Sequence, residues 1–105
     1  MADKLLGLLG MARRAGRLSM GFDAVQGGVR DRSVKLVLLA ADSAARTEKE
    51  VRFSVEKAGS STPIYRVAAD MEAIGAALGM QKQVAVLGVL DEGFAKAVGE
   101  IVAGG

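Results

Sequence analysis

Two nearly continuous apolar runs constrain the fold of this chain more than any other feature. Residues 34–40 read Val-Lys-Leu-Val-Leu-Leu-Ala, and residues 84–90 read Val-Ala-Val-Leu-Gly-Val-Leu. A strand with one face in water alternates apolar and polar residues, whereas a strand covered on both faces is apolar almost throughout. Both runs therefore predict central strands of a sheet that carries helices on its two faces.

The segments around these runs alternate between helical and strand-like periodicity. Residues 3–15 show the i, i+3, i+4, i+7 spacing of an amphipathic helix, which Gly16 would end. Thr47 and Glu50 fit a capping box that would open a helix closed by Gly59. The same reasoning predicts further helices at residues 21–31 and 70–78 and from residue 91 onward, and shorter strands at residues 17–20 and 64–67. This order predicts one α/β domain over residues 1–105, built as a three-layer α-β-α sandwich around four strands.

Composition argues against most catalytic chemistry. The chain contains no Cys and no His, which removes disulfides, the usual zinc ligands and the commonest nucleophile–base pairs. The glycine-rich phosphate motifs of nucleotide enzymes do not occur in it. We therefore expect neither an enzyme nor a protein with a metal ion or a cofactor.

The distribution of apolar residues indicates a cytoplasmic protein. No run approaches the ~18 unbroken apolar residues of a membrane span. The leucine-rich start is followed by Arg13 and Arg14 and by no small-residue cleavage pattern, so we do not expect a secretory signal.

Three aspartates, Asp42, Asp70 and Asp91, each follow a predicted strand. An α/β enzyme places catalytic carboxylates at such positions, but aspartate is also a common helix cap and turn residue. We favour the structural interpretation.

Charge is unevenly placed along the chain. Residues 1–35 contain seven Lys and Arg and three Asp, a net charge of +4, whereas the remaining residues carry −2. Clustered Lys and Arg favour polyanion binding through phosphate neutralisation and counterion release. An ordinary solvated surface fits the same numbers, and Arg13 and Arg14 would also complement the dipole at the end of the first helix.

Gly21 stands where the strand at residues 17–20 would pass into the next helix. A glycine there lets the backbone approach a ligand, and a helix start exposes N–H groups that suit a phosphate. A hydrophobic helix start would explain Phe22 and Val25 at least as well. Five further residues would lie near Gly21, either because they are close in the chain or because the helical period returns them to the same side: Arg17, Phe22, Asp23, Gln26 and Arg30.

Gly27 and Gly28 lie in the interior of the same predicted helix. Each costs about 1 kcal/mol relative to alanine, so a close approach on that face would be a physical reason to keep them.

Several segments together resemble a known family over essentially the whole chain. They are LLGMARRAGRL at residues 8–18, Gly21, KLVLLAAD at residues 35–42, TPIY at residues 62–65 and IGAALG at residues 74–79. The chain resembles the kink-turn RNA-binding ribosomal proteins of the L7Ae type, and within them the small bacterial YlxQ-like branch. The resemblance implies an α-β-α sandwich with a central, mostly four-stranded mixed sheet, and recognition of kinked RNA with sheared G·A pairs in connection with ribosomes.

In kink-turn binders of that family the second helix begins with a motif close to Gly-Ala-Asn-Glu-Val-Thr-Lys, whose Asn, Glu and Lys contact the G·A pairs. Gly21 and Val25 match this motif, whereas Asp23, Ala24 and Gly27 replace the three contact residues. Phe22 replaces the motif's Ala and Gln26 its Thr. The family's second RNA-facing loop corresponds to residues 79–83, which include Gly79 and Lys82 and are more polar than we expect of that loop.

We therefore expect a non-catalytic protein that binds structured RNA, with ribosomal RNA the leading candidate, ribosomal proteins as further partners, and neither DNA nor a membrane. Gly21 would meet the RNA backbone, Asp23 and Gln26 would face bases, and the cationic side chains would meet phosphates. We expect Gly21 either to have a positive φ or to lie in close contact with RNA. The full predicted RNA-binding set is Arg13, Arg14, Arg17, Gly21, Phe22, Asp23, Gln26, Arg30, Gly79 and Lys82. The alternative is a protein-interaction module that keeps the fold and has lost kink-turn recognition.

Overall fold

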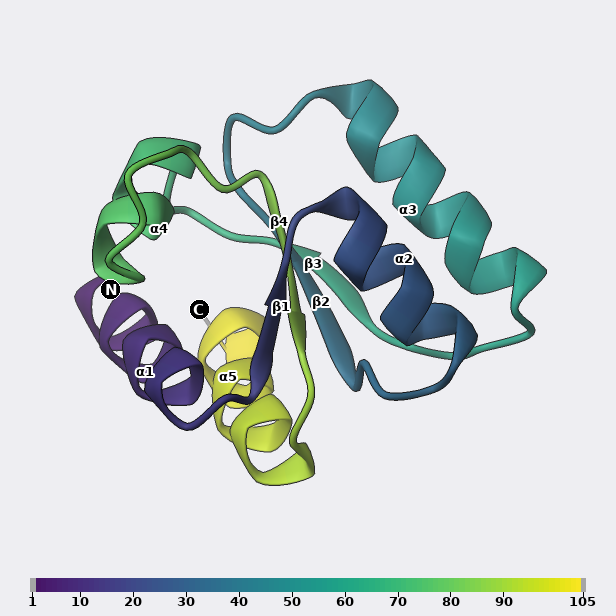
Figure 1. The fold of residues 1–105 in the computed structure, drawn as a ribbon, viewed down its shortest axis with the longest axis horizontal. Helices are drawn as coiled ribbons and strands as arrows, with labels where there is room; N and C mark the ends of the chain where they lie inside the picture. The colour runs from purple at the N-terminus through teal and green to yellow at the C-terminus, as the bar shows by residue number, and fades with distance from the viewer. Residues whose placement is uncertain (1, 105) are drawn as a thin grey trace.

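The computed structural model describes residues 2–104, in which five helices and four strands alternate (Figure 1). The order of elements agrees with the order predicted from periodicity. The elements are α1 (Ala2–Arg14), β1 (Leu18–Met20), α2 (Phe22–Arg30), β2 (Leu36–Leu39), α3 (Ala45–Lys57), β3 (Ile64–Arg66), α4 (Met71–Ala77), β4 (Val86–Val89) and α5 (Glu92–Gly104). None of these helices is long and apolar enough to cross a membrane.

The four strands form one mixed sheet in the order β1-β4-β2-β3. β4 runs antiparallel to both β1 and β2, whereas β2 and β3 are parallel. In this register Leu38 lies opposite Leu87 on one side and Tyr65 on the other. The predicted four-stranded mixed sheet is therefore confirmed.

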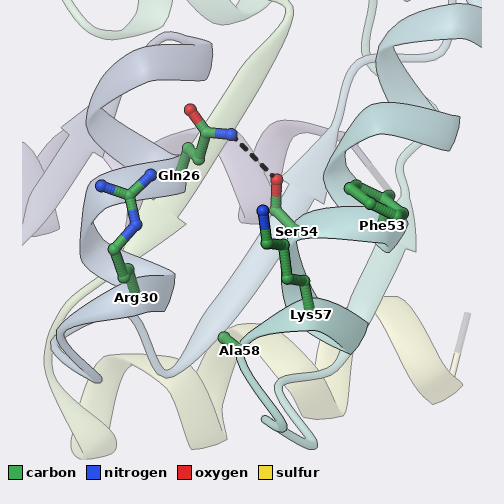
Figure 2. A pocket seen from close by; sticks show the side chains of 6 residues that line it. All are labelled: Gln26, Arg30, Phe53, Ser54, Lys57 and Ala58. Carbon is green, nitrogen blue, oxygen red and sulfur yellow. Dashed lines mark hydrogen bonds between the residues drawn. The ribbon is translucent and has the colours of Figure 1, made fainter.

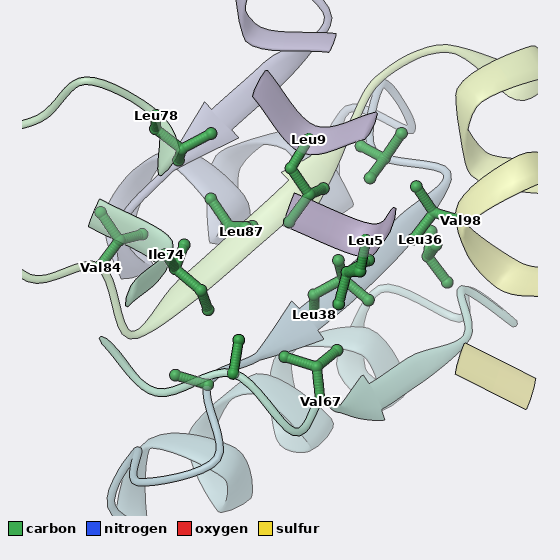
Figure 3. Packing of buried hydrophobic residues seen from close by; sticks show 13 residues of the cluster. Leu5, Leu9, Leu36, Leu38, Val67, Ile74, Leu78, Val84, Leu87 and Val98 are labelled. Atoms are coloured by element: carbon green, nitrogen blue, oxygen red, sulfur yellow. The ribbon is translucent and has the colours of Figure 1, made fainter. Parts of the chain in front are cut away.

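Helices cover both faces of the sheet, as the apolar runs predict. α2 and α3 lie on one face, and α1, α4 and α5 lie on the other (Figure 1). Because side chains alternate along a strand, Leu38 and Leu87 pack into the cluster under α1, α4 and α5, while Val37 and Val86 pack under α2 and α3. Figure 3 shows the larger cluster, in which helical residues such as Leu9 gather against the sheet.

The paired part of each central strand is shorter than its apolar run. The ladder between β2 and β4 covers four residue pairs, from Leu36 with Val89 to Leu39 with Val86. Val34 and Val84 lie outside it and are still buried, at 3% and 4% exposure. Burial of the flanking residues thus extends the apolar pattern beyond the hydrogen-bonded strands, which is why sequence periodicity overestimates strand length.

The prediction that Thr47 caps α3 is wrong. The helix begins at Ala45, its N-cap is Ala44, and the cap side chain makes no hydrogen bond. Tertiary contacts decide this end, because Arg66 of β3 donates to the carbonyl oxygens of Ala40 and Ser43 and so shapes the loop that enters the helix. The chain therefore reaches helical geometry earlier than the local capping pattern indicates.

The two adjacent glycines of α2 have different surroundings. A Cβ on Gly28 would overlap the Cγ2 methyl of Val34 and approach the Ser33 hydroxyl oxygen at 3.1 Å, whereas a Cβ on Gly27 would meet nothing within 4 Å. The close approach expected on this helix is therefore present at Gly28 alone. Val34 is buried and β-branched, so it has little freedom to move aside.

Alanine substitutions at these two positions should change stability in opposite directions. Gly27→Ala should raise the free energy of unfolding by about 0.5–1 kcal/mol, because it removes the conformational entropy cost of a glycine in a helix. Gly28→Ala should lower it by about 1–3 kcal/mol through overpacking against Val34. Urea denaturation of both variants beside the native protein measures the difference, and a shift of both in the same direction would contradict this packing.

Candidate nucleic-acid interface

Strand directions bring four loop segments to one edge of the sheet: the start of α2 at residues 21–24, and the loops at residues 40–44, 67–70 and 79–85. β1, β2 and β3 end at this edge and β4 begins there, because β4 alone is antiparallel to its neighbours. We call it the α2 edge, since α2 also starts there, at the top of the view in Figure 1. The N–H of Gly21 donates to the carbonyl oxygen of Val86 at 3.0 Å, which joins the start of α2 to the start of β4.

Gly21 has a backbone conformation that essentially only glycine adopts. Its φ of 95° and ψ of 157° lie in a region where an L side chain is strained, so the first of the two alternatives expected for this residue, a positive φ, is confirmed. No side chain caps the helix that follows, so its first N–H groups face the α2 edge without an intrahelical partner. Asp23 and Ala24 are exposed beside them, while Phe22 is half-buried and packs against the apolar cluster under α2 and α3.

The segment at residues 79–85 is the second part of the α2 edge. α4 ends with a Schellman motif, in which Met80 N–H donates to Gly75 and Gly79 N–H donates to Ala76, and Gly79 has a φ of 71°. The carbonyl group of Lys82 packs so closely on Gly75 that a Cβ there would overlap it. The backbone of this loop is thus held against α4, while the Lys82 side chain is exposed.

The third segment, residues 40–44, is held by Arg66. Besides donating to carbonyl groups of this loop, the Arg66 guanidinium contacts a carboxylate oxygen of Glu48 at 2.6 Å. Hydrogen bonds from Arg66 and then from Arg52 hold the pKa of Glu48 below its ordinary value of 4.5. Arg66 therefore supports the α2 edge through bonds within the protein.

Asp42, Asp70 and Asp91 accept hydrogen bonds from helix N–H groups, as the structural interpretation predicts. Asp42 bonds the N–H of Met71 at 2.8 Å, and Asp70 and Asp91 bond the N–H groups three residues later at 2.8 and 2.9 Å. Within residues 2–104, no three acidic side chains are grouped so that they could hold a metal ion.

The structure divides the predicted RNA-binding residues between two edges of the sheet. Gly21, Phe22, Asp23, Gly79 and Lys82 belong to the α2 edge. Arg17 precedes β1, and Arg13 and Arg14 end α1, so they lie at the opposite edge. Arg30 is the last residue of α2, about 13 Å along the helix from Gly21.

Gln26 lies between the two groups and faces α3, and its Nε2 donates to the hydroxyl oxygen of Ser54 at 3.2 Å. It lines a hollow with residues of α3 that sequence reasoning missed, among them Phe53 and Lys57 (Figure 2). A signal was present in the sequence. Val51 and Val55 form the buried face of α3, and Phe53 falls two residues from each, on the other side of the helix.

Comparisons with known proteins identify the family. A family model described as "Ribosomal protein L7Ae/L30e/S12e/Gadd45 family" matches residues 3–99. The chain belongs to this family. It is 30% identical over 102 residues to the RNA-binding protein YlxQ of Enterococcus faecium, covering 97% of this chain and 94% of that protein. It is 34% identical over 88 residues to the RNA-binding protein YlxQ of Bacillus subtilis strain 168, covering 84% of each.

Solved structures agree with this assignment. A protein described as of unknown function from Bacillus halodurans C superposes with a TM-score of 0.84 at 30% identity, covering 95% of this chain and 97% of that one. A Giardia lamblia 15.5kD RNA binding protein superposes with a TM-score of 0.74 at 22% identity, covering 98% of this chain and 85% of that one, which shows a shared fold. The predicted membership in the YlxQ-like branch is confirmed, and the family together with the names of these relatives bears out a protein that is not an enzyme.

The contact between Glu48 and Arg66 should make the free energy of unfolding decrease as the pH falls into the acid range. A carboxyl whose pKa is lowered by folding contributes stability above its unfolded pKa and loses it as pH falls through the folded pKa. The native protein should therefore exceed Glu48→Gln in free energy of unfolding at pH 7, and this difference should shrink below about pH 4.5. Denaturant titrations from pH 7 to pH 3 measure it. In an Arg66→Gln background the same substitution should show less pH dependence, and an equal dependence would remove Arg66 as the main cause.

Proposed function

We propose that this protein binds structured, kinked RNA at the α2 edge, without catalysis and in association with ribosomes in the cytoplasm. The observation that carries the proposal is the backbone of Gly21. Its conformation sets the uncapped start of α2 beside Val86 and the loop that precedes β4. These are the two segments that the family resemblance assigns to RNA, and the family and both named relatives support RNA as the ligand.

Each residue of the α2 edge has a role that its chemistry allows. The first N–H groups of α2 carry the positive end of the helix dipole and suit a phosphate or a base carbonyl. Asp23 accepts hydrogen bonds from base N–H groups, and the exposed ammonium of Lys82 meets a phosphate. Gly79 contributes by ending α4 so that this loop turns back towards β4.

Arg13, Arg14, Arg17 and Arg30 contribute differently in this proposal. A single RNA must extend along β1 and α2 to reach both edges of the sheet, so these side chains contact phosphates away from the kink. Such contacts raise affinity for any RNA sequence and depend strongly on salt, whereas recognition of the kink rests on the α2 edge. Ribosomal RNA is the RNA we propose, with ribosomal proteins as neighbours in the assembly.

One observation favours a second candidate function, a protein-interaction module. Asp23 and Ala24 stand where the family's kink-turn binders carry Asn and Glu. An ionised Asp cannot donate to a guanine carbonyl, and it repels nearby phosphates. A module that has lost RNA recognition would show this same change.

Restoring both family residues tests the carried-over site. Asp23→Asn with Ala24→Glu should tighten binding to a generic kink-turn RNA, because each repaired base contact contributes about 1–3 kcal/mol when its geometry is good. The native protein should bind this RNA more weakly at the same salt. Titrations of both proteins by fluorescence anisotropy, with the labelled kink-turn and with an unkinked duplex of equal length, measure the effect.

The duplex serves as the control, because its affinity should change little in the double variant. Equal affinity of the two proteins for the kink-turn would mean that the start of α2 does not face the G·A pairs. If neither protein binds either RNA above background, the protein-interaction module becomes the better account.

A further inference from the structure

The hollow between α2 and α3 is a second surface feature, separate from the α2 edge. It has a volume of about 250 Å³, below the ~300–1,000 Å³ of sites that enclose a small molecule, so it fits part of a larger ligand. Gln26, Arg30 and Ser54 line it together with Phe53, Lys57 and Ala58 (Figure 2). We call it the α2–α3 hollow.

Phe53 stands out because it is 63% exposed. The core does not need it, since Val51 and Val55 already supply the buried face of α3. An exposed ring costs hydrophobic free energy that burial would recover, and it offers a flat surface for stacking. Phe22, the other aromatic residue packed on this face of the sheet, is half-buried, so Phe53 is the aromatic side chain here that is open to solvent.

The charges at the hollow favour an anionic ligand. In the described part of the chain its lining includes Arg30 and Lys57, both exposed, and no carboxylate. Towards the start of α3 the groove continues past Lys49 and past Arg46, which pairs with Glu50 across 3.6 Å. This pair is exposed and largely screened by water. Glu48 and Glu56 line a separate hollow on the other side of Phe53, with Lys49 and Arg52. The positive charge is therefore concentrated on the side of the ring that faces α2, at Arg30 and Lys57.

The polar groups between the two helices leave an acceptor for the ligand. Gln26 donates its Nε2 to Ser54, whose hydroxyl donates to the carbonyl oxygen of Glu50. Figure 2 shows the carboxamide oxygen of Gln26 pointing away from Ser54. Because this hydrogen bond orients the amide, its oxygen is placed to accept from an N–H group.

We propose that the α2–α3 hollow binds one nucleotide of a single-stranded stretch of RNA. The base stacks on Phe53 and donates to Gln26, and its phosphate lies between Arg30 and Lys57. This rests on the proposed RNA binding and adds a contact outside the α2 edge. Gln26 lies little more than one turn after Gly21, so a strand leaving a kink at the start of α2 reaches the hollow by following that helix.

A protein partner fits these observations less well. Protein interfaces are depleted of Lys and bury several apolar side chains together, whereas two Lys flank a single exposed ring here. A cationic groove with an aromatic platform is the arrangement found in proteins that bind single-stranded nucleic acid.

A tryptophan reporter tests this directly, because the native chain contains no Trp. Phe53→Trp keeps a stacking surface, and titration with a ten-nucleotide oligouridylate should quench its fluorescence as a base stacks on it. Adding Arg30→Gln and Lys57→Gln should weaken this binding at least tenfold and lower the slope of log affinity against log salt by about 0.7, the value for one phosphate neutralised on a single strand. Phe53→Ser, followed by anisotropy of a labelled oligonucleotide, should weaken binding at least about fivefold.

Met11→Trp combined with Arg13→Gln and Arg14→Gln is the matched control, because the two glutamines remove the phosphate contacts proposed beside Met11. Among the described residues Met11 is the other exposed large apolar side chain, and it lies on α1, across the sheet. It should show no quenching by the oligonucleotide. Absence of quenching in Phe53→Trp, or equal quenching in both variants, would overturn the proposal. If decaglutamate quenches Phe53→Trp as strongly as the oligonucleotide does, the ligand of the hollow is an acidic peptide and not RNA, which contradicts the proposal.

Failure of this site can be told apart from failure of the α2 edge. Lys82→Gln should weaken binding of a kink-turn RNA and leave the quenching of Phe53→Trp by oligouridylate unchanged. If the native protein does not bind the kink-turn while quenching persists, the proposed nucleotide site in the hollow is supported and kink recognition at the α2 edge is contradicted. If the kink-turn binds and quenching is absent, the hollow alone is wrong.

Discussion

Burial of both faces of β2 and β4 is the constraint on which the rest of this structure depends. Side chains of these strands alternate between the cluster under α1, α4 and α5 and the cluster under α2 and α3, so neither helical layer can be removed without exposing apolar residues. Because β4 runs antiparallel between β1 and β2, its amino end lies beside their carboxyl ends. The pairing that builds the core therefore also brings the start of α2 and residues 79–85 to one edge.

Most of the fold could be predicted from the sequence because its signals are local. Hydrophobic periodicity predicted every helix and strand in order, and Asp70 and Asp91 cap helices as their positions indicate. The start of α3 could not be predicted this way. Its determinant is Arg66, which lies 18 residues from Glu48 and holds the preceding loop by contacts that only the folded sheet creates.

Only the part of the candidate site that depends on local backbone geometry could be predicted from the sequence. Gly21 could be singled out because a strand-to-helix junction with a glycine indicates an unusual φ. The basic residues could not be placed, since Arg17 is four residues from Gly21 and yet lies beyond the other end of β1. The hollow beside Phe53 was also missed, because it needs α2 and α3 to pack side by side on one face of the sheet.

The central claim is that RNA binds this protein mainly at the α2 edge. Amide chemical-shift mapping tests this claim most directly. A ¹⁵N-labelled sample titrated with a kink-turn RNA at fixed salt reports on each backbone N–H of this small domain. The account predicts the largest shifts at residues 21–24 and 79–85, with smaller ones at residues 13–17. Shifts concentrated on residues 13–17 and 30–33, with residues 21–24 unmoved, would contradict it.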